Sequence, residues 1–151
     1  MMKRILLFVI SATLSLGSAM AQEGLYVEDL FEGRVVPQSQ MKRSFISGSS
    51  LKPYNLDTYK SLTFTVDEAT FHSVEILILN DAQGTEDQQL IYDEGHLVYA
   101  LVCIPPTHSG LNRFLCFQAA KTGRLWDTTV VYLRGVASIG DLDKMFNKKR
   151  K

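Results

Sequence analysis

The sequence contains few cysteine, proline and tryptophan residues, no net charge and none of the common catalytic or nucleotide-binding motifs. It contains two cysteines, four prolines and one tryptophan in 151 residues, and its 16 basic residues are balanced by 16 acidic residues. A sequence without net positive charge does not indicate nucleic-acid binding. Glycine-rich phosphate loops, dinucleotide fingerprints and Gly-x-Ser-x-Gly elbows are absent as well. We therefore expect no cofactor, and the sequence indicates no particular reaction.

The first 21 residues have the pattern of an export signal. Lys3 and Arg4 give the positive start, an apolar run follows from Ile5 to Leu16, and Ala19-Met20-Ala21 is a small-residue cleavage pattern. A membrane anchor is the competing interpretation, but the run is shorter than the roughly 20 residues that a spanning helix needs. We expect residues 1–21 to be a cleaved signal peptide. The product should lie in the periplasm or outer cell envelope, without a transmembrane segment.

Residues 22–147 are predicted to form a single domain. Their number suits one hydrophobic core, and no repeat or low-complexity segment interrupts them. Cleavage of the signal would remove two of the 16 basic residues, which leaves 14 against 16 acidic residues. The last four residues, 148–151, are all basic and are predicted to be a disordered tail.

The apolar segments between Gln88 and Arg134 form the predicted core layer. Residues 96–104 and 112–119 are apolar at almost every position, which is typical of strands covered on both faces. Three turn sequences, each with a glycine near its end, separate the segments: Asp93–His96, Pro105–Gly110 and Lys121–Gly123. The sequence therefore predicts a four-stranded antiparallel meander over about 88–134.

The segment before the meander is predicted to contain one strand and one helix. Ser61–Val66 alternates strictly between polar and apolar residues, as a half-buried strand does. Asp67–Asn80 fits either a helix or a strand by its apolar spacing. We favour a helix, because Thr65 and Glu68 can form a capping box. The order over 61–80 is thus a strand followed by a helix.

Helices are also predicted at both ends of the domain. The apolar spacing around Leu30 indicates a short helix that Gly33 ends, and Ser138 with Asp141 can cap a closing helix. Val35–Tyr59 has no regular pattern and is expected to lie irregularly against the core. Its surroundings carry basic residues that fit a solvated face better than a positive patch: Arg34, Lys42, Arg43, Lys52 and Lys60.

Together these elements predict an α+β fold. The N- and C-terminal helices and the helix within 61–80 should cover one face of the sheet, and Val35–Tyr59 part of the other face. If Asp67–Asn80 is extended instead, the alternative is a predominantly β sandwich.

The two cysteines, Cys103 and Cys116, come from neighbouring strands of the predicted meander. An exported chain permits a disulfide. If Ile104 faces Leu111 across the second hairpin, however, the thiols share a face but are offset by four residues, which is too far for a disulfide. We favour two buried small apolar side chains over a disulfide.

Histidines and carboxylates supply an enzymatic hypothesis. None of His72, His96 and His108 has the i, i+4 spacing that places two imidazoles on one helical face, so no metal site is predicted. His96 follows Asp93 and Glu94, although carboxylates are common in turns. A small secreted hydrolase or metal-dependent enzyme that uses His96 or His108 with nearby carboxylates is therefore an alternative function.

Aromatic residues of the meander give a faint binding signal. Trp126 and Tyr132 share strand parity, and Tyr99 comes from the same predicted sheet. Rings that point outward could stack on a sugar or peptide, whereas inward rings belong to the core, which is the commoner case for tryptophan. The leading hypothesis is an exported, non-catalytic module that binds an envelope protein, peptide or glycan through Trp126, Tyr132 and Tyr99. A carrier of an apolar small ligand, held between sheet and helices, is a further alternative.

Four stretches carry a resemblance to a known family. They are Gly48–Leu62, Leu101–Pro106, Asn112–Phe117 and Val131–Gly135. With them, the whole chain after the signal resembles a family of small exported proteins of unknown function from Bacteroides and its relatives. The resemblance implies the compartment and the fold, and it brings no activity, partner or catalytic residue.

Overall fold

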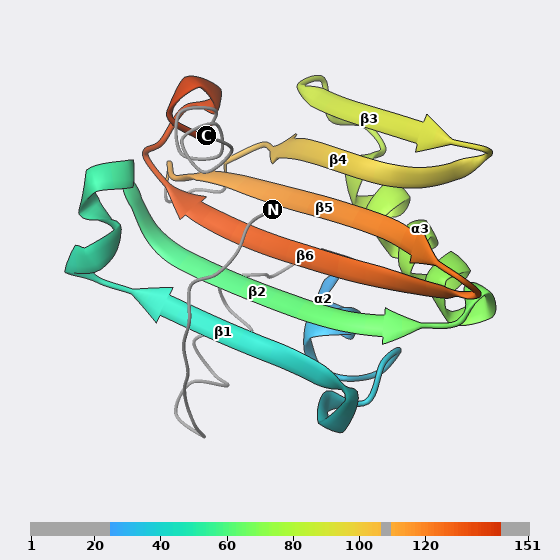
Figure 1. Cartoon of the computed structure of the whole chain (residues 1–151). Coiled ribbons are helices and arrows are strands. Elements are labelled where there is room, and N and C mark those ends of the chain that lie inside the picture. The colour runs from blue at the N-terminus through green and yellow to red at the C-terminus, as the bar shows by residue number, and fades with distance from the viewer. Residues whose placement is uncertain (1–24, 107–109, 143–151) are drawn as a thin grey trace.

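The computed structural model describes residues 25–106 and 110–142, which form a sheet with helices packed behind it (Figure 1). In these residues, six strands form one antiparallel sheet in the order β1-β2-β6-β5-β4-β3. The strands are β1 (Met41–Ser47), β2 (Leu56–Val66), β3 (Gln88–Asp93), β4 (His96–Ile104), β5 (Asn112–Thr122) and β6 (Leu125–Gly135). The predicted α+β class is confirmed. The four-stranded description is only roughly right, because β1 and β2 extend the meander to six strands.

β1 corrects the prediction that Val35–Tyr59 is irregular. The strand pairs with β2 from Met41 opposite Phe64 to Ser47 opposite Thr58. In the described sheet it is an edge strand, in which four of the seven residues are partly buried and none is fully buried. A strand paired and covered in this way needs neither strict alternation nor a continuous apolar run. The sequence pattern of β1 is therefore weak.

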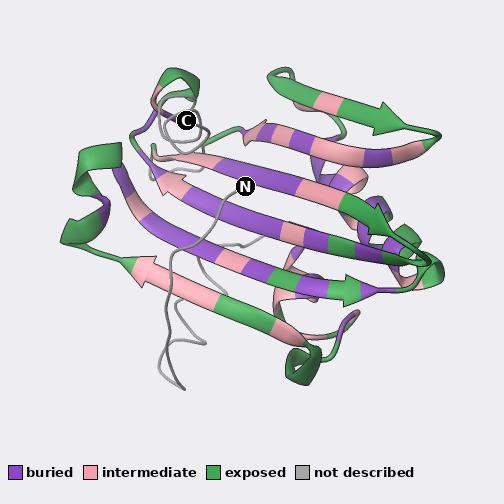
Figure 2. Cartoon of the chain, viewed as in Figure 1, coloured by how far each residue is buried: buried purple, intermediate pink, exposed green. Residues whose placement is uncertain are grey.

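Two α-helices cover one face of the sheet, which we call the helical face. α2 (Glu28–Phe31) and α3 (Glu68–Ala82) lie behind the strands in Figure 1. Leu30 of α2 and Phe71 of α3 pack in one core with Leu62, Leu115 and Val130 of the strands. Figure 2 shows that burial is greatest along the middle strands. The helical face thus holds the larger core.

The opposite face, which we call the second face, has a core of its own. Leu51 comes from the 3-10 helix η2 (Ser49–Tyr54), and it packs in one cluster with Phe114, Val131 and Leu142. A further 3-10 turn, η1 (Gln38–Gln40), precedes β1. The prediction that Val35–Tyr59 covers part of this face is correct for η2. Apolar packing on both faces explains the continuous apolar pattern of β5 and β6.

α3 is the helix predicted within 61–80, but a different residue caps it. The Asp67 side chain accepts a hydrogen bond from the Thr70 N–H at 2.9 Å, and its backbone is extended, with φ −79° and ψ 175°. This bond holds the pKa of the Asp67 carboxyl below its usual value. Thr65, the predicted cap, stays in β2 and donates to Asp127 at 2.7 Å. The capping-box prediction was therefore wrong by two residues.

A carboxylate at the end of α3 ties α2 to the rest of the molecule. Asp81 accepts the backbone N–H of Tyr26 at 2.7 Å and that of Val27 at 2.8 Å. Burial raises the pKa of the Asp81 carboxyl, although the two backbone bonds act in the opposite direction. Because α2 has a single turn, this link and its apolar residues hold it in place.

The predicted cap of the closing helix is confirmed. The Ser138 N–H donates to Asp141 Oδ2 at 2.9 Å, and the Asp141 N–H donates to Ser138 Oγ at 3.2 Å. Residues 139–142 are helical. Leu142 packs with Phe114 and Val131 on the second face, so the prediction that the C-terminal helix covers the same face as α2 and α3 was wrong. The predicted signal peptide and the basic tail lie outside the described residues. Within 25–106 and 110–142, no helix is both long and apolar enough to cross a membrane.

Candidate functional site

A cavity of about 400 Å³ opens at one end of β4 and β5. Its lining comes from the connection between α3 and β3, the end of β4, the start of β5 and the residues after β6: Gly84, Glu86, Asp87, Cys103, Ile104, Pro105, Pro106, Asn112, Arg113, Phe114, Ser138 and Ile139. We call it the loop-end cavity. Connections positioned by a rigid sheet are a common place for binding residues, and this volume lies within the range of small-ligand sites.

Hydrogen bonds fix the walls of the loop-end cavity to one another. The Asn112 side-chain amide donates to the Ala137 carbonyl at 2.9 Å, which ties β5 to the segment after β6. The Cys103 N–H donates to the Asp87 carbonyl at 2.9 Å, which ties β4 to the start of β3. Arg113 supplies a positive charge, whereas Glu86 and Asp87 supply negative charge. The cavity therefore offers both donors and acceptors to a ligand.

Cys103 lines the loop-end cavity, and both cysteines are free. Burial raises the pKa of the half-buried Cys103 thiol, with a smaller effect from Asp87. For the deeper Cys116 thiol, burial raises the pKa to about 12. Both thiols stay protonated at neutral pH, which makes them weak nucleophiles.

The register of the second hairpin differs from the prediction. Ile104 lies opposite Arg113 rather than Leu111, and Cys103 lies opposite Phe114. The two cysteines are therefore offset by two residues along the sheet instead of four. Pro105 and Pro106 have no N–H to donate, so pairing stops at Ile104 and the connection takes more residues.

The aromatic residues predicted to bind a ligand do not converge. Trp126 is 3% exposed and Tyr132 is fully buried, and both point into the helical face. Trp126 stacks on Phe71, with the ring centroids 4.0 Å apart and an angle of 3° between the rings. Tyr99 is half-buried on the second face, opposite Gln118 of β5. Trp126 and Tyr132 therefore belong to the core, because they share strand parity with Val130 on the helical face.

His96 contacts carboxylates of α3, not the Asp93 and Glu94 that precede it in sequence. Its Nδ1 lies 3.4 Å from Glu75 and its Nε2 lies 3.4 Å from Glu68. Glu75 was not predicted as a partner of a histidine. Its only sequence signal is its position one helical turn after His72. His108 lies outside the described residues. Among the described residues, no group of three His, Cys, Asp or Glu side chains is arranged to hold a metal ion.

Glu75 has a structural partner that explains its burial. β4 has a register shift near its start, where Ile91 faces Tyr99 while Tyr92 faces Leu97. The Leu97 N–H at this irregularity donates to the Glu75 carboxylate at 2.7 Å. A buried N–H without an acceptor would be costly. Glu75 therefore serves the fold by joining α3 to β4.

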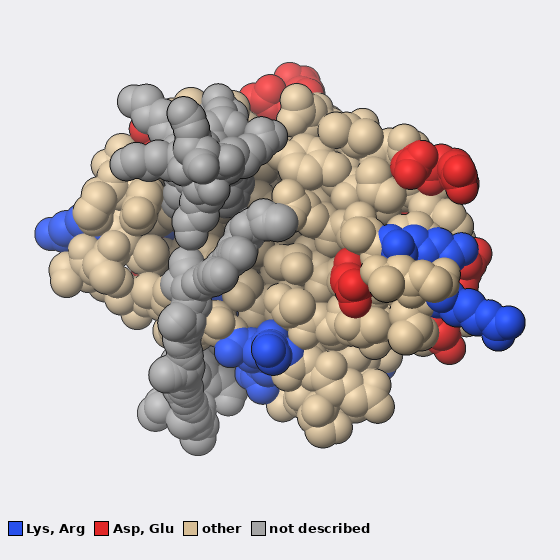
Figure 3. Space-filling view, in the orientation of Figure 1, with Lys and Arg blue, Asp and Glu red and all other residues tan. Residues whose placement is uncertain are grey.

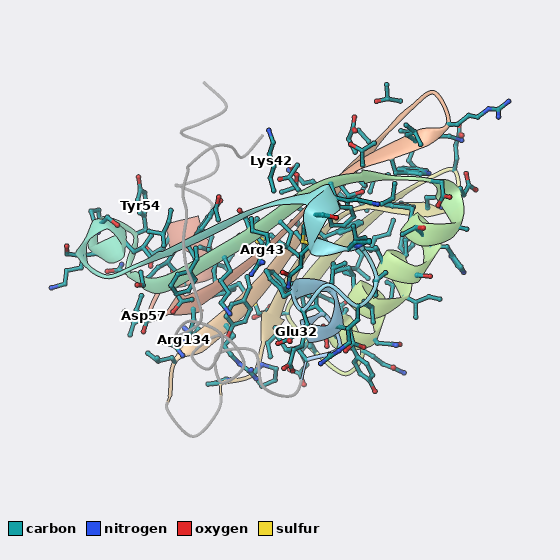
Figure 4. All side chains as sticks on the ribbon, turned by 90° about the horizontal axis from the view of Figure 1, so that it is seen from below. Glu32, Lys42, Arg43, Tyr54, Asp57 and Arg134 are labelled. Carbon is teal, nitrogen blue, oxygen red and sulfur yellow. The ribbon has the colours of Figure 1, made fainter. Side chains whose placement is uncertain are left out.

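Charged residues also lie on the helical face near α2, where β1, β2 and β6 run side by side. Arg43, Asp57 and Arg134 lie on the same side of the sheet as Glu32, whereas Lys42 and Tyr54 lie on the other side (Figure 4). The Arg134 Nε lies 3.0 Å from the Asp57 carboxylate. Lys60, predicted to be solvated, is only 4% exposed. Its Nζ lies about 6 Å from the ring centroids of three aromatic residues, which are Phe31, Phe45 and Tyr132.

Comparison with protein families assigns the chain to one of them. The profile of a family of unknown function, DUF6108, matches residues 14–146. The chain belongs to the DUF6108 family. No curated protein and no solved structure matches it. DUF6108 membership agrees with the resemblance to an uncharacterised family, while the Bacteroides-type origin and the export remain predictions. For this DUF6108 chain, the loop-end cavity is the candidate site, because loop-borne polar and apolar groups meet there.

Proposed function

We propose that the chain is an exported, non-catalytic binding module of the bacterial cell envelope. The loop-end cavity carries this proposal, because apolar side chains such as Ile104 and Phe114 share its lining with a few charged groups. Ligand sites commonly have this composition. Export is supported by the signal pattern of residues 1–21.

A protein or peptide segment suits the cavity better than a purely apolar ligand. Arg113 brings a positive charge to the lining, and Glu86 and Asp87 bring carboxylate acceptors. A peptide backbone carries both kinds of group in every residue. An apolar molecule would remove water from the Glu86 and Asp87 carboxylates without offering them a donor, which is unfavourable.

The chemistry of the lining favours binding over catalysis. A nucleophilic cysteine needs a lowered pKa, and the pKa of Cys103 is raised. His96, the histidine of the enzymatic alternative that the structure describes, lies against α3, and it does not line the cavity. The hydrolase alternative therefore gains no support from this site.

Filling the cavity tests the proposed function. Pro106 is exposed and lines the cavity, whereas Pro37 is exposed before β1 and does not. The chain is used to capture partners from envelope extract, and each captured protein is identified by mass spectrometry, purified and titrated. We expect Pro106→Trp to weaken its binding about tenfold or more, since a filled pocket removes the contacts of an interface centre. Pro37→Trp should bind as the native chain does.

Two outcomes would overturn the proposal. One is that the native chain captures no more protein than the bare matrix. The other is that Pro106→Trp and Pro37→Trp bind the purified partner equally well while both variants keep the native unfolding temperature.

A further inference from the structure

β3 is an edge of the described sheet, and its outer side is exposed. In the order β1-β2-β6-β5-β4-β3 it pairs with β4 alone among the described strands. Ile91 is 51% exposed and Tyr92 is 52% exposed, although both are large apolar side chains. Figure 1 shows β3 at the margin of the sheet. An exposed edge strand is a template for pairing with another extended chain.

The direction of the backbone groups along β3 follows from one hydrogen bond. The Asp87 carbonyl accepts from Cys103, so the backbone groups of Asp87 point toward β4. Successive residues of an antiparallel strand turn their N–H and C=O groups to opposite sides. The extra residue at the register shift lies on β4, so the alternation along β3 is unbroken. Leu90 and Tyr92 therefore point their backbone groups outward, and Gln89 and Ile91 point theirs toward β4.

The two edges of the sheet differ in how they are protected. Natural edge strands are often blunted by lysine or proline. β1 has Lys42 and Arg43 near its centre, whereas Gln88–Asp93 contains no lysine, arginine or proline. The register shift of the β3–β4 hairpin lies near its turn and leaves the first part of β3 regular. Of the two edges, β3 is the one open to an added strand.

The charge around β3 argues against a second copy of the chain as the occupant. Glu86 and Asp87 precede the strand, and Asp93 and Glu94 end it. Figure 3 shows acidic side chains at both ends of the margin where β3 lies in Figure 1. Antiparallel pairing of two β3 strands centred on Leu90, whose backbone groups point outward, would place Asp87 opposite Asp93 and Glu86 opposite Glu94. Like charges placed opposite one another destabilise a strand pair.

We propose that the outer edge of β3 binds an extended peptide segment as an added strand, and that the segment is uncharged in its middle and basic at its ends. The proposal rests on the proposed binding function and names the class of its partner. Main-chain hydrogen bonds to Leu90 and Tyr92 supply affinity, and the acidic ends select the basic flanks. Glu86 and Asp87 also line the loop-end cavity, so one basic end of the peptide lies beside that cavity.

The test uses the full exported chain and a short synthetic peptide that has a lysine pair at each end and alternating threonine and valine between them. Amide exchange is followed by NMR with and without the peptide. We expect the amides of Leu90 and Tyr92 to become at least about tenfold more protected, because they gain acceptors. The amides of Gln89 and Ile91, which already face β4, should change little.

Peptide variants separate strand addition from charge attraction alone. Two peptides are N-methylated at every second residue, in the two possible alternations. The peptide whose methylated nitrogens face β3 loses its donors and should not bind. The peptide whose methylated nitrogens face away from β3 should still bind. A peptide with glutamate pairs in place of the lysines should bind at least about tenfold more weakly at low salt. Equal binding by both N-methylated peptides would overturn the proposal, as would tighter binding of the acidic peptide.

A charge-matched pair of variants completes the test. Glu86→Gln with Asp93→Asn removes one acidic group at each end of β3, and Glu28→Gln with Glu32→Gln removes two near α2. The first double variant should bind the basic peptide about fivefold more weakly, as expected for two exposed charge pairs. The second should bind it as the native chain does, and equal losses in both would contradict a site at β3.

The outcomes distinguish this proposal from the binding function beneath it. Peptide-induced protection in β1 or on the second face, instead of β3, overturns the strand-addition proposal and leaves the binding function standing. No peptide binding, together with capture of an envelope partner that Pro106→Trp weakens, has the same meaning. If neither the peptide nor any partner binds, both proposals fail.

Discussion

Lys60 is a cation that the fold places inside. It lies opposite Phe45 on one side and Tyr132 on the other, and the rings of these residues and Phe31 surround its ammonium group. Contacts of this kind stabilise a cation. Burial is nevertheless the largest influence, and it lowers the pKa of Lys60 to about 8. The sequence signal for the burial of Lys60 was strand parity. Lys60, Leu62 and Phe64 are alternate residues of β2, so their side chains lie on the same face of the sheet.

The buried charge predicts a pH dependence of stability. Between pH 8 and 10.5 the unfolded chain holds a proton on Lys60 that the folded chain has released, so this residue makes stability rise with pH. The full change would be about 3 kcal/mol at about 1.4 kcal/mol per pH unit, and solvent screening lowers our expectation to about 2 kcal/mol. Relative to Lys60→Met, the native chain should gain this amount over that range in urea unfolding.

The exposed Lys52 provides the matched control for this measurement. Lys52→Met should follow the pH curve of the native chain, because Lys52 is exposed and this substitution leaves the buried Lys60 in place. Parallel curves for the native chain and Lys60→Met would show that Lys60 carries no burial penalty.

At the scale of elements, the predictions succeeded where burial imposed a pattern. The covered middle parts of β5 and β6, Phe114–Phe117 and Val130–Leu133, are apolar at every position, so the meander was visible in the sequence. Burial imposes no such pattern on β1, because β1 is an edge strand. The cap of α3 was misplaced because Asp67 and Thr65 both fit the sequence rule, and only the end of β2 decides between them.

Gly135 marks a close approach of β6 to the start of β2, which sequence could not reveal. A Cβ there would lie 2.5 Å from the Asn55 carbonyl oxygen and 2.6 Å from the Leu56 Cα. Both are backbone atoms, so the strands would have to move. We expect Gly135→Ala to lower the free energy of unfolding by about 2–4 kcal/mol, as measured by urea denaturation.

Gly140 is the control for the same substitution. A Cβ there would come no closer than 3.6 Å, to the Ser138 hydroxyl, and the residue is helical. Gly140→Ala should leave stability unchanged or raise it by about 0.5–1 kcal/mol. Equal effects of the two substitutions would contradict the close packing of β6 on β2.

At the scale of the whole molecule, the candidate site was not predicted from the sequence. Cys103 was considered only for a disulfide, and Arg113 and Asp87 were not predicted as site residues. These three residues come from different elements and meet only because β4 stands between β3 and β5. Trp126 and Tyr132 drew attention as aromatic residues, but strand parity turned them inward. Long-range pairing of this kind is set by the whole sheet, which local sequence patterns do not encode.

The middle of the sheet is covered on both faces, and its β3 edge is open. Amide exchange of the free chain, followed residue by residue, tests this most directly. We predict the slowest exchange in Phe114–Phe117 and Val130–Leu133, slow exchange at Gln89 and Ile91, and fast exchange at Leu90 and Tyr92. Slow exchange at Leu90 and Tyr92 without any partner would contradict an open β3 edge, because that edge would then already be paired.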